Sequence, residues 1–140
     1  MALVPEIASI VLYFIVGVIC LSMAYVSMFS KKYLPFHEEA AGMKWEEHGP
    51  GLQATILTLF QLSGLGFFII GLMLAVFPIL NLFDRSRVIA VSVPLLALVF
   101  CAGLAYFNYQ LHRKTKTDTP WQSSIAAMAL IVIAFVLSLL

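Results

Sequence analysis

The chain has 140 residues, of which 62% are hydrophobic and only 11% are charged, and its formal net charge is +1. A soluble domain carries about 25% charged residues, so this composition indicates an integral membrane protein of one domain. So small a net charge gives no electrostatic support for binding to nucleic acid. The two cysteines, Cys20 and Cys101, both lie in apolar stretches. Buried thiols of that kind are usually packing residues, and their number and spacing suggest neither a disulfide framework nor a metal cluster.

Four stretches are long and apolar enough to cross a bilayer, for which a helix needs ~20 mainly apolar residues. We expect an all-α bundle of four transmembrane helices over residues 7–29, 52–80, 87–111 and 120–140, joined by loops at 30–51 and 112–119. The second helix is the longest, so it must tilt or project beyond the bilayer. Pro94 lies inside the third helix, where it removes one backbone hydrogen bond and should cause a kink.

The distribution of lysine and arginine predicts the orientation of the bundle. The two longer loops hold six basic residues, which are Lys31, Lys32, Lys44, Arg113, Lys114 and Lys116. The turn between the second and third helices holds only Arg85 and Arg87. Because basic residues concentrate in cytoplasmic loops, we expect both longer loops in the cytoplasm and both termini outside.

The stretch from residue 37 to 51 carries most of the polar chemistry, in the mirrored pattern His-Glu-Glu then Glu-Glu-His. One interpretation is a metal site. In one continuous helix, however, His37 and His48 would lie about 16 Å apart, too far to share an ion. A site would then need a break in the helix, or His112 from the other loop. The simpler interpretation is a short interfacial helix whose apolar residues, Trp45 among them, dip into the headgroup region.

A second group of polar side chains lies in the cytoplasmic halves of the helices. The candidate cavity residues are Gln53, Gln61, Tyr106 and Asn108. We place Gln61 near the bilayer midplane, where an amide needs a partner because hydrocarbon offers none. Hydrogen bonds between helices would satisfy these groups. The functional alternative is a polar-lined cavity, open to the cytoplasm under residues 37–51, that holds a small amphiphile such as a lipid or quinone.

The sequence lacks the residues that several common functions of membrane proteins require. No acidic, basic or histidine side chain lies in the middle of a predicted helix, although an ion or proton pathway normally needs one. No motif links a nucleophile to a base. We therefore expect no enzymatic activity and no resident cofactor.

Several short motifs, spread over most of the chain, resemble one protein group. They are His37-Glu38-x-Ala40-x-Gly42-x-x-Trp45-Glu46, Pro50-Gly51-x-Gln53-Ala54 and Lys116-Thr117-x-Thr119-Pro120-Trp121, with the glycines of the second helix. They are similar to a group of small bacterial four-helix membrane proteins that have no assigned activity. The resemblance implies the four-helix topology and a place in a bacterial inner membrane, but no ligand.

Three functional hypotheses remain. The first is a non-catalytic accessory or structural subunit of a larger membrane complex, whose partners would be other membrane subunits and lipid. The second is a protein that binds or transports a small amphiphile, using the cavity described above. The third is a metal-dependent membrane enzyme that uses His37, His48 and His112.

Overall fold

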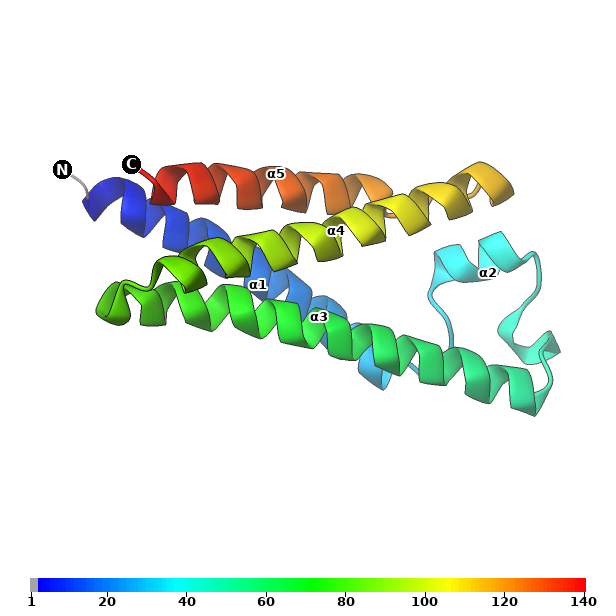
Figure 1. The fold of residues 1–140 in the computed structure, drawn as a ribbon. Coiled ribbons are helices and arrows are strands. Elements are labelled where there is room, and N and C mark those ends of the chain that lie inside the picture. Colours follow the sequence, from blue (N-terminus) through cyan, green and yellow to red (C-terminus); the bar gives the residue numbers. More distant parts are fainter. Residues whose placement is uncertain (1–2) are drawn as a thin grey trace.

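The computed structural model describes residues 3–140 and is helical in all its regular structure. The elements are α1 (Leu3–Phe29), α2 (Pro35–Ala41), a 3-10 turn η1 (Trp45–Glu47), α3 (Pro50–Asp84), α4 (Arg87–Thr115) and α5 (Trp121–Ser138). Both ends of the chain lie at one end of the bundle, and α2 lies at the other end (Figure 1). We call these the terminal end and the α2 end.

Four of the helices, α1, α3, α4 and α5, are long and apolar enough to cross a membrane. Large apolar side chains cover their outer faces, among them Phe14, Phe68, Val99 and Ile133. Such a surface suits lipid and would be costly in water. The expected all-helical fold with four spanning helices is therefore confirmed in these respects, and the chain has the character of a membrane protein.

The helix ends differ from those expected, and the backbone at each end explains why. Helix α3 begins at Pro50, a residue that suits the first turn, and ends where Arg85 adopts a left-handed conformation with φ 48°. Its 35 residues give it a length of ~52 Å at ~1.5 Å per residue, well beyond a hydrocarbon core of ~30 Å. Helix α4 continues to Thr115 and ends in the same way, with Lys116 at φ 59°.

Glycines bring α1 and α3 into backbone contact. A Cβ atom added to Gly17 would lie 2.9 Å from the carbonyl oxygen of Gly71, and one added to Gly71 would lie 2.8 Å from the Leu21 side chain. Gly64 packs in the same way against Ala24 and the Met28 side chain. Since Gly64 and Gly71 are seven residues apart, they lie on one face of α3, and that face is turned towards α1.

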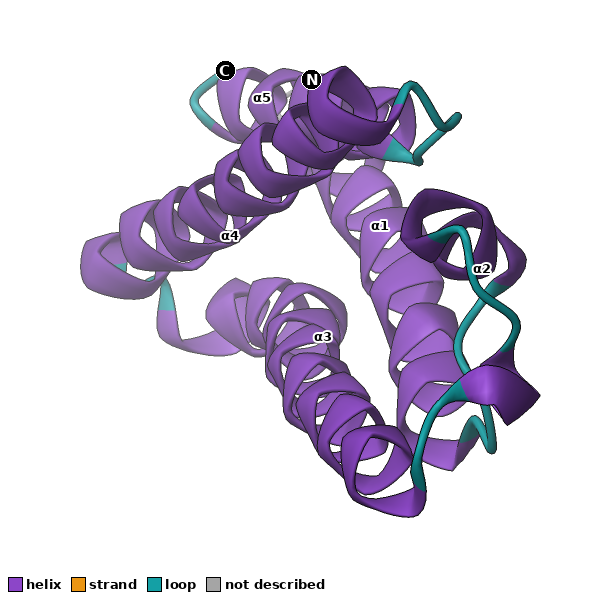
Figure 2. Ribbon diagram, turned by 90° about the vertical axis from the view of Figure 1, so that its right-hand side faces the viewer, coloured by secondary structure: helices purple, strands orange, loops and turns teal. Residues whose placement is uncertain are grey.

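The other two long helices complete the core. The fully buried core residues come from α1, α3 and α5, and they are Val16, Leu74, Ile131 and Ala134. Helix α4 contributes the buried residues Val93, Ala97 and Cys101. The hydroxyl of Ser9 in α1 donates a hydrogen bond of 2.7 Å to the carbonyl of Ala134 in α5. Figure 2 shows the four long helices from the α2 end, with α2 on the near side. The tight core thus occupies the middle and the terminal end.

Candidate functional site

A cavity of about 450 Å³ opens between the long helices at the α2 end. Its walls come from α1, α3, α4 and α5, and its residues are mainly apolar, such as Ile19, Phe60, Phe67, Leu104 and Ala127. Ligand pockets for small organic molecules usually have volumes of ~300–1,000 Å³. The cavity is therefore large enough for the head and first part of the tail of an amphiphile.

The cavity lies where α3 and α4 diverge towards the α2 end (Figure 1). They are joined by a short turn at residues 85–86, and halfway along they meet where the rings of Phe67 and Phe100 pack edge to face, with centroids 5.2 Å apart. The Phe100 ring also packs closely against Gly66, because a Cβ atom added to this glycine would lie 3.2 Å from the ring. Beyond this contact, Phe60 of α3 stacks near the ring of His37 in α2, with centroids 4.8 Å apart. A short helix thus lies beside the cavity where α3 and α4 have moved apart.

His37 is the most distinctive polar residue of the cavity wall. Its ring lies between Phe36 and Phe60, with centroid distances of 3.9 and 4.8 Å. Its Nδ1 atom is buried and has no hydrogen-bond partner among residues 3–140. Burial lowers the pKa of this imidazole from its ordinary value of 6.5, so the ring is neutral at pH 7. A neutral imidazole with a free ring nitrogen can form a hydrogen bond with a hydroxyl or carbonyl group.

The segment that carries His37 is fixed by a buried tyrosine. Tyr33 is 5% exposed, and its hydroxyl donates to the carbonyl of Met43. Because the only hydroxyl proton is used there, His48 must donate from Nε2 to the same oxygen, at 2.7 Å. The ring of Trp45 packs edge to face on Tyr33, and the Gln53 side chain donates to the Trp45 carbonyl at 2.9 Å. Residues 33–48 are therefore tied to the start of α3.

The loop between α4 and α5 shapes the opposite wall. His112 donates from Nδ1 to the carbonyl of Thr117 at 2.7 Å, and the buried Thr119 hydroxyl donates to the carbonyl of Asn108 at 2.8 Å. These bonds hold Pro120 against the cavity. They also set the start of α5, where Trp121 packs on Tyr109 with centroids 5.4 Å apart.

The structure does not bring the four candidate cavity residues together. Asn108 lines the cavity, although its amide donates to Leu104 of its own helix at 3.0 Å. Gln53 is bound to the Trp45 carbonyl, and Tyr106 is exposed and accepts a hydrogen bond from Gln110. Gln61 is also exposed. Its neighbour Phe60 lines the cavity, whereas Gln61 does not.

The three histidines considered as metal ligands also have separate surroundings. His37 faces the cavity, His48 is bonded to Tyr33, and His112 is bonded to Thr117. Within residues 3–140, no group of three or more His, Cys, Asp or Glu side chains is close enough to hold a metal ion. The structure therefore does not bring the three histidines into one site.

The four candidate cavity residues do not include the hydroxyl groups that line the cavity, which are Ser27, Ser63, Ser123 and Ser124. A signal was present, because Gly64 and Gly71 mark the inward face of α3. Residues 60, 63, 64, 67 and 71 share that face at helical spacing, whereas residue 61 does not. The glycines could thus have identified Ser63 in place of Gln61.

Comparisons with known proteins give no relative from which to extend this description. No protein-family model matches the chain, and neither a curated protein nor a solved structure matches it significantly.

Proposed function

We propose that this protein binds an uncharged amphiphile, such as a quinone or a neutral lipid, in the cavity at the α2 end. The observation that carries the proposal is an apolar cavity of about 450 Å³ with the unpartnered Nδ1 of His37 in its wall. A buried polar atom without a partner costs free energy. A ligand that forms a hydrogen bond with it would remove that cost.

The wall chemistry favours an uncharged headgroup. Among the described residues, the lining includes no Lys, Arg, Asp or Glu side chain, and its polar groups are serine hydroxyls, the Asn108 amide and the neutral His37 ring. Such groups bind carbonyl and hydroxyl oxygens, whereas phosphate headgroups are usually bound by arginine or lysine. The rest of the ligand would be apolar, because the remaining walls are.

The same proposal includes a location. We infer a bacterial inner membrane, with the α2 end in the cytoplasm and both termini outside. The support is the charge pattern, since Lys31, Lys32 and Lys44 lie beside α2 and Arg113, Lys114 and Lys116 lie at the same end of the bundle. The amphiphile would then enter from the cytoplasmic leaflet or from the side of the bilayer.

A cavity-filling substitution tests the proposal. In Ala127→Phe the new ring would occupy the cavity, and in the matched control Ala126→Phe it would lie on the exposed side of the same helix. The protein is purified in a mild detergent, and the bound lipids and quinones are extracted and quantified by mass spectrometry. We expect the wild type and Ala126→Phe to carry one amphiphile at fixed stoichiometry, and Ala127→Phe to lose it. If all three proteins carry the same bulk lipids in the same amounts, the proposal is wrong.

A second variant examines the headgroup contact. His37→Phe keeps an aromatic ring against Phe60 but has no ring nitrogen. We expect it to weaken binding of the extracted amphiphile roughly tenfold, which corresponds to one hydrogen bond of ~1.4 kcal/mol. Unchanged affinity would mean that the headgroup binds elsewhere in the cavity.

A role as a non-catalytic accessory subunit is a second proposal, and one observation favours it. Gln61 is exposed on the outer face of α3, and its amide forms no hydrogen bond within the described part of the chain. A neighbouring membrane subunit could supply that partner. Co-purification of a larger complex at fixed stoichiometry from wild-type membranes, but not from Gln61→Leu membranes, would support it. A protein that always purifies alone would exclude it.

A further inference from the structure

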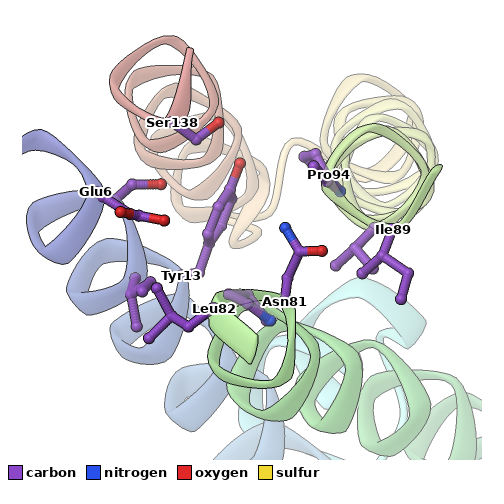
Figure 3. Close-up of a pocket in the computed structure, with 12 residues that line it drawn as sticks. Glu6, Tyr13, Asn81, Leu82, Ile89, Pro94 and Ser138 are labelled. Atoms are coloured by element: carbon purple, nitrogen blue, oxygen red, sulfur yellow. The ribbon is translucent and has the colours of Figure 1, made fainter. Parts of the chain in front are cut away.

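A second, smaller cavity lies at the terminal end of the bundle and is separate from the amphiphile site. Its volume is about 80 Å³, and every long helix contributes to its wall (Figure 3). The polar lining residues are Glu6, Ser9 and Tyr13 of α1, Asn81 of α3 and Ser138 of α5. The volume admits several waters, or one ion with part of its hydration shell, since a single water needs ~10–15 Å³ on this measure.

One buried polar atom in this wall has no partner, and a second has a single neighbour. The Oδ1 atom of Asn81 is buried and forms no hydrogen bond within residues 3–140. Tyr13 is 4% exposed, and its hydroxyl lies beside the side chain of Ser138. Figure 3 shows the Tyr13 side chain extending into the space between the helices. Both residues line the cavity, and unpaired polar atoms of this kind usually mark a bound water or ion.

A proline also frees one backbone carbonyl in a residue of the same wall. Pro94 lies inside α4 and has no N–H, so the carbonyl of Ala90 lacks its α-helical donor. Both Ala90 and Pro94 line the cavity, as does Pro78, the proline inside α3. In membrane proteins, carbonyls released from helical hydrogen bonding often coordinate Na⁺.

The remaining polar groups are arranged as acceptors. The hydroxyl of Ser9 donates its proton to the Ala134 carbonyl at 2.7 Å, and that of Ser138 donates to the Phe135 carbonyl at 2.6 Å. Each hydroxyl oxygen is left with lone pairs only. Glu6 brings a carboxylate, and no Lys, Arg or His stands among the described lining residues to neutralise it. A wall whose polar atoms are mainly oxygens, with one carboxylate, suits a hard cation of charge +1 better than a divalent ion, which usually needs several carboxylates.

We propose that this terminal-end cavity binds one monovalent alkali cation through Glu6, Asn81 and the neighbouring hydroxyl and carbonyl oxygens. The site does not depend on the amphiphile proposal, because it shares no residue with the other cavity. The cation would link α1, α3, α4 and α5 at the end of the bundle where both termini lie.

Thermal unfolding of the full chain in detergent tests this site. NaCl or KCl replaces N-methyl-D-glucamine chloride at constant ionic strength, and Tm is followed against cation concentration. We expect a saturable rise in Tm, because a ligand that binds only the folded state stabilises it. In Glu6→Gln the half-saturating concentration should rise roughly tenfold or more, as expected for loss of a charged contact. The control Glu39→Gln, which removes an exposed carboxylate in α2, should behave as the wild type.

A second measurement tests the proposal even if Glu6→Gln fails to fold. The ²³Na NMR line of a NaCl solution broadens when the ion exchanges with a protein site, and this can be measured on the wild type and on the milder variant Ser138→Ala. We expect broadening by the wild type and less by Ser138→Ala. The proposal is overturned if Na⁺ and K⁺ act no differently from N-methyl-D-glucamine and the NMR line does not broaden, which would mean that the cavity holds only water. It is equally overturned if folded Glu6→Gln responds as the wild type does.

Discussion

Around Gly17 and Gly71 the backbones of α1 and α3 touch, whereas around Phe60, at the α2 end, the inward face of α3 meets the ring of His37 instead of another long helix. The difference follows from side-chain size. Glycines allow direct contact between α1 and α3, but Phe67 and Phe100 set the spacing between α3 and α4. Where bulky residues hold two membrane helices apart, a cavity remains, and here the short segment of residues 33–48 adjoins it. The bundle is therefore closely packed between α1 and α3 and more open between α3 and α4 at the α2 end.

The largest effect should come from disturbing the packed contact. In Gly17→Ala the new methyl group would lie 2.9 Å from the Gly71 carbonyl oxygen and 3.0 Å from the Ala75 nitrogen, so backbone must move to admit it. We expect a loss of ~1–3 kcal/mol in the free energy of unfolding, the usual cost of overpacking. Titration with SDS in mixed micelles, followed by circular dichroism, measures this quantity.

The matched control is Gly103→Ala in α4. A Cβ there has no heavy atom within 4 Å among the described residues outside its own helical turn. We expect a change within ~0.5 kcal/mol, as for exposed sites elsewhere. Equal effects of the two substitutions would contradict the idea that α1 and α3 are in backbone contact.

A smaller effect is expected from loosening the segment beside the cavity. Tyr33→Phe removes the hydroxyl that bonds the Met43 carbonyl and His48, at a cost of ~1 kcal/mol. The loss should be local. Amide hydrogen exchange of residues 35–48 should become about five times faster, which corresponds to that free energy, while exchange in the middle of α1 and α3 stays unchanged. Tyr25→Phe is the control, because Tyr25 is 68% exposed and lies outside this segment. Unchanged exchange in Tyr33→Phe would show that the segment is held by other contacts.

The sequence was sufficient for the fold because hydrophobic length is a strong signal. Runs of apolar residues located all four long helices, and Pro120 marked the start of the last one. The helix ends at Asp84 and Thr115 were less accessible. They depend on left-handed conformations of Arg85 and Lys116, whereas the residue that usually adopts this conformation at a helix end is glycine or asparagine.

The cavity was harder to predict because its position depends on how far two helices separate. Polarity alone favoured Gln61, which is exposed, over Ser63, which lines the wall two residues later. His37 was considered only as a metal ligand, since nothing in the sequence places its ring beside Phe60. Contacts between segments this far apart are set by packing, and one sequence without its relatives does not reveal them.

The smallest expected effect is a pH dependence of the segment that carries His37. Burial lowers the pKa of His37 below 6.5, the ordinary value that the ring regains when the segment opens. At a pH between the lowered and the ordinary value, the opened segment therefore binds a proton more readily than the packed segment does. The stability of the packed state is therefore complete above pH 6.5. It falls as the pH drops below 6.5, and it levels off below the lowered pKa. Hydrogen exchange of residues 35–41, corrected for the intrinsic pH dependence of exchange, should report more frequent opening at pH 5.5 than at pH 7.5.

His37→Phe should abolish this dependence. A variant that keeps the wild-type pH dependence would show that another group causes it. The result bears on the cavity as well as on the loop, because protonation places a positive charge in a wall whose other described residues are uncharged. If an uncharged amphiphile accepts or donates a hydrogen bond at Nδ1, its affinity should fall over the same pH range in which the segment opens. Loss of both responses in His37→Phe would show that one imidazole controls the fit of the segment and the binding of the headgroup.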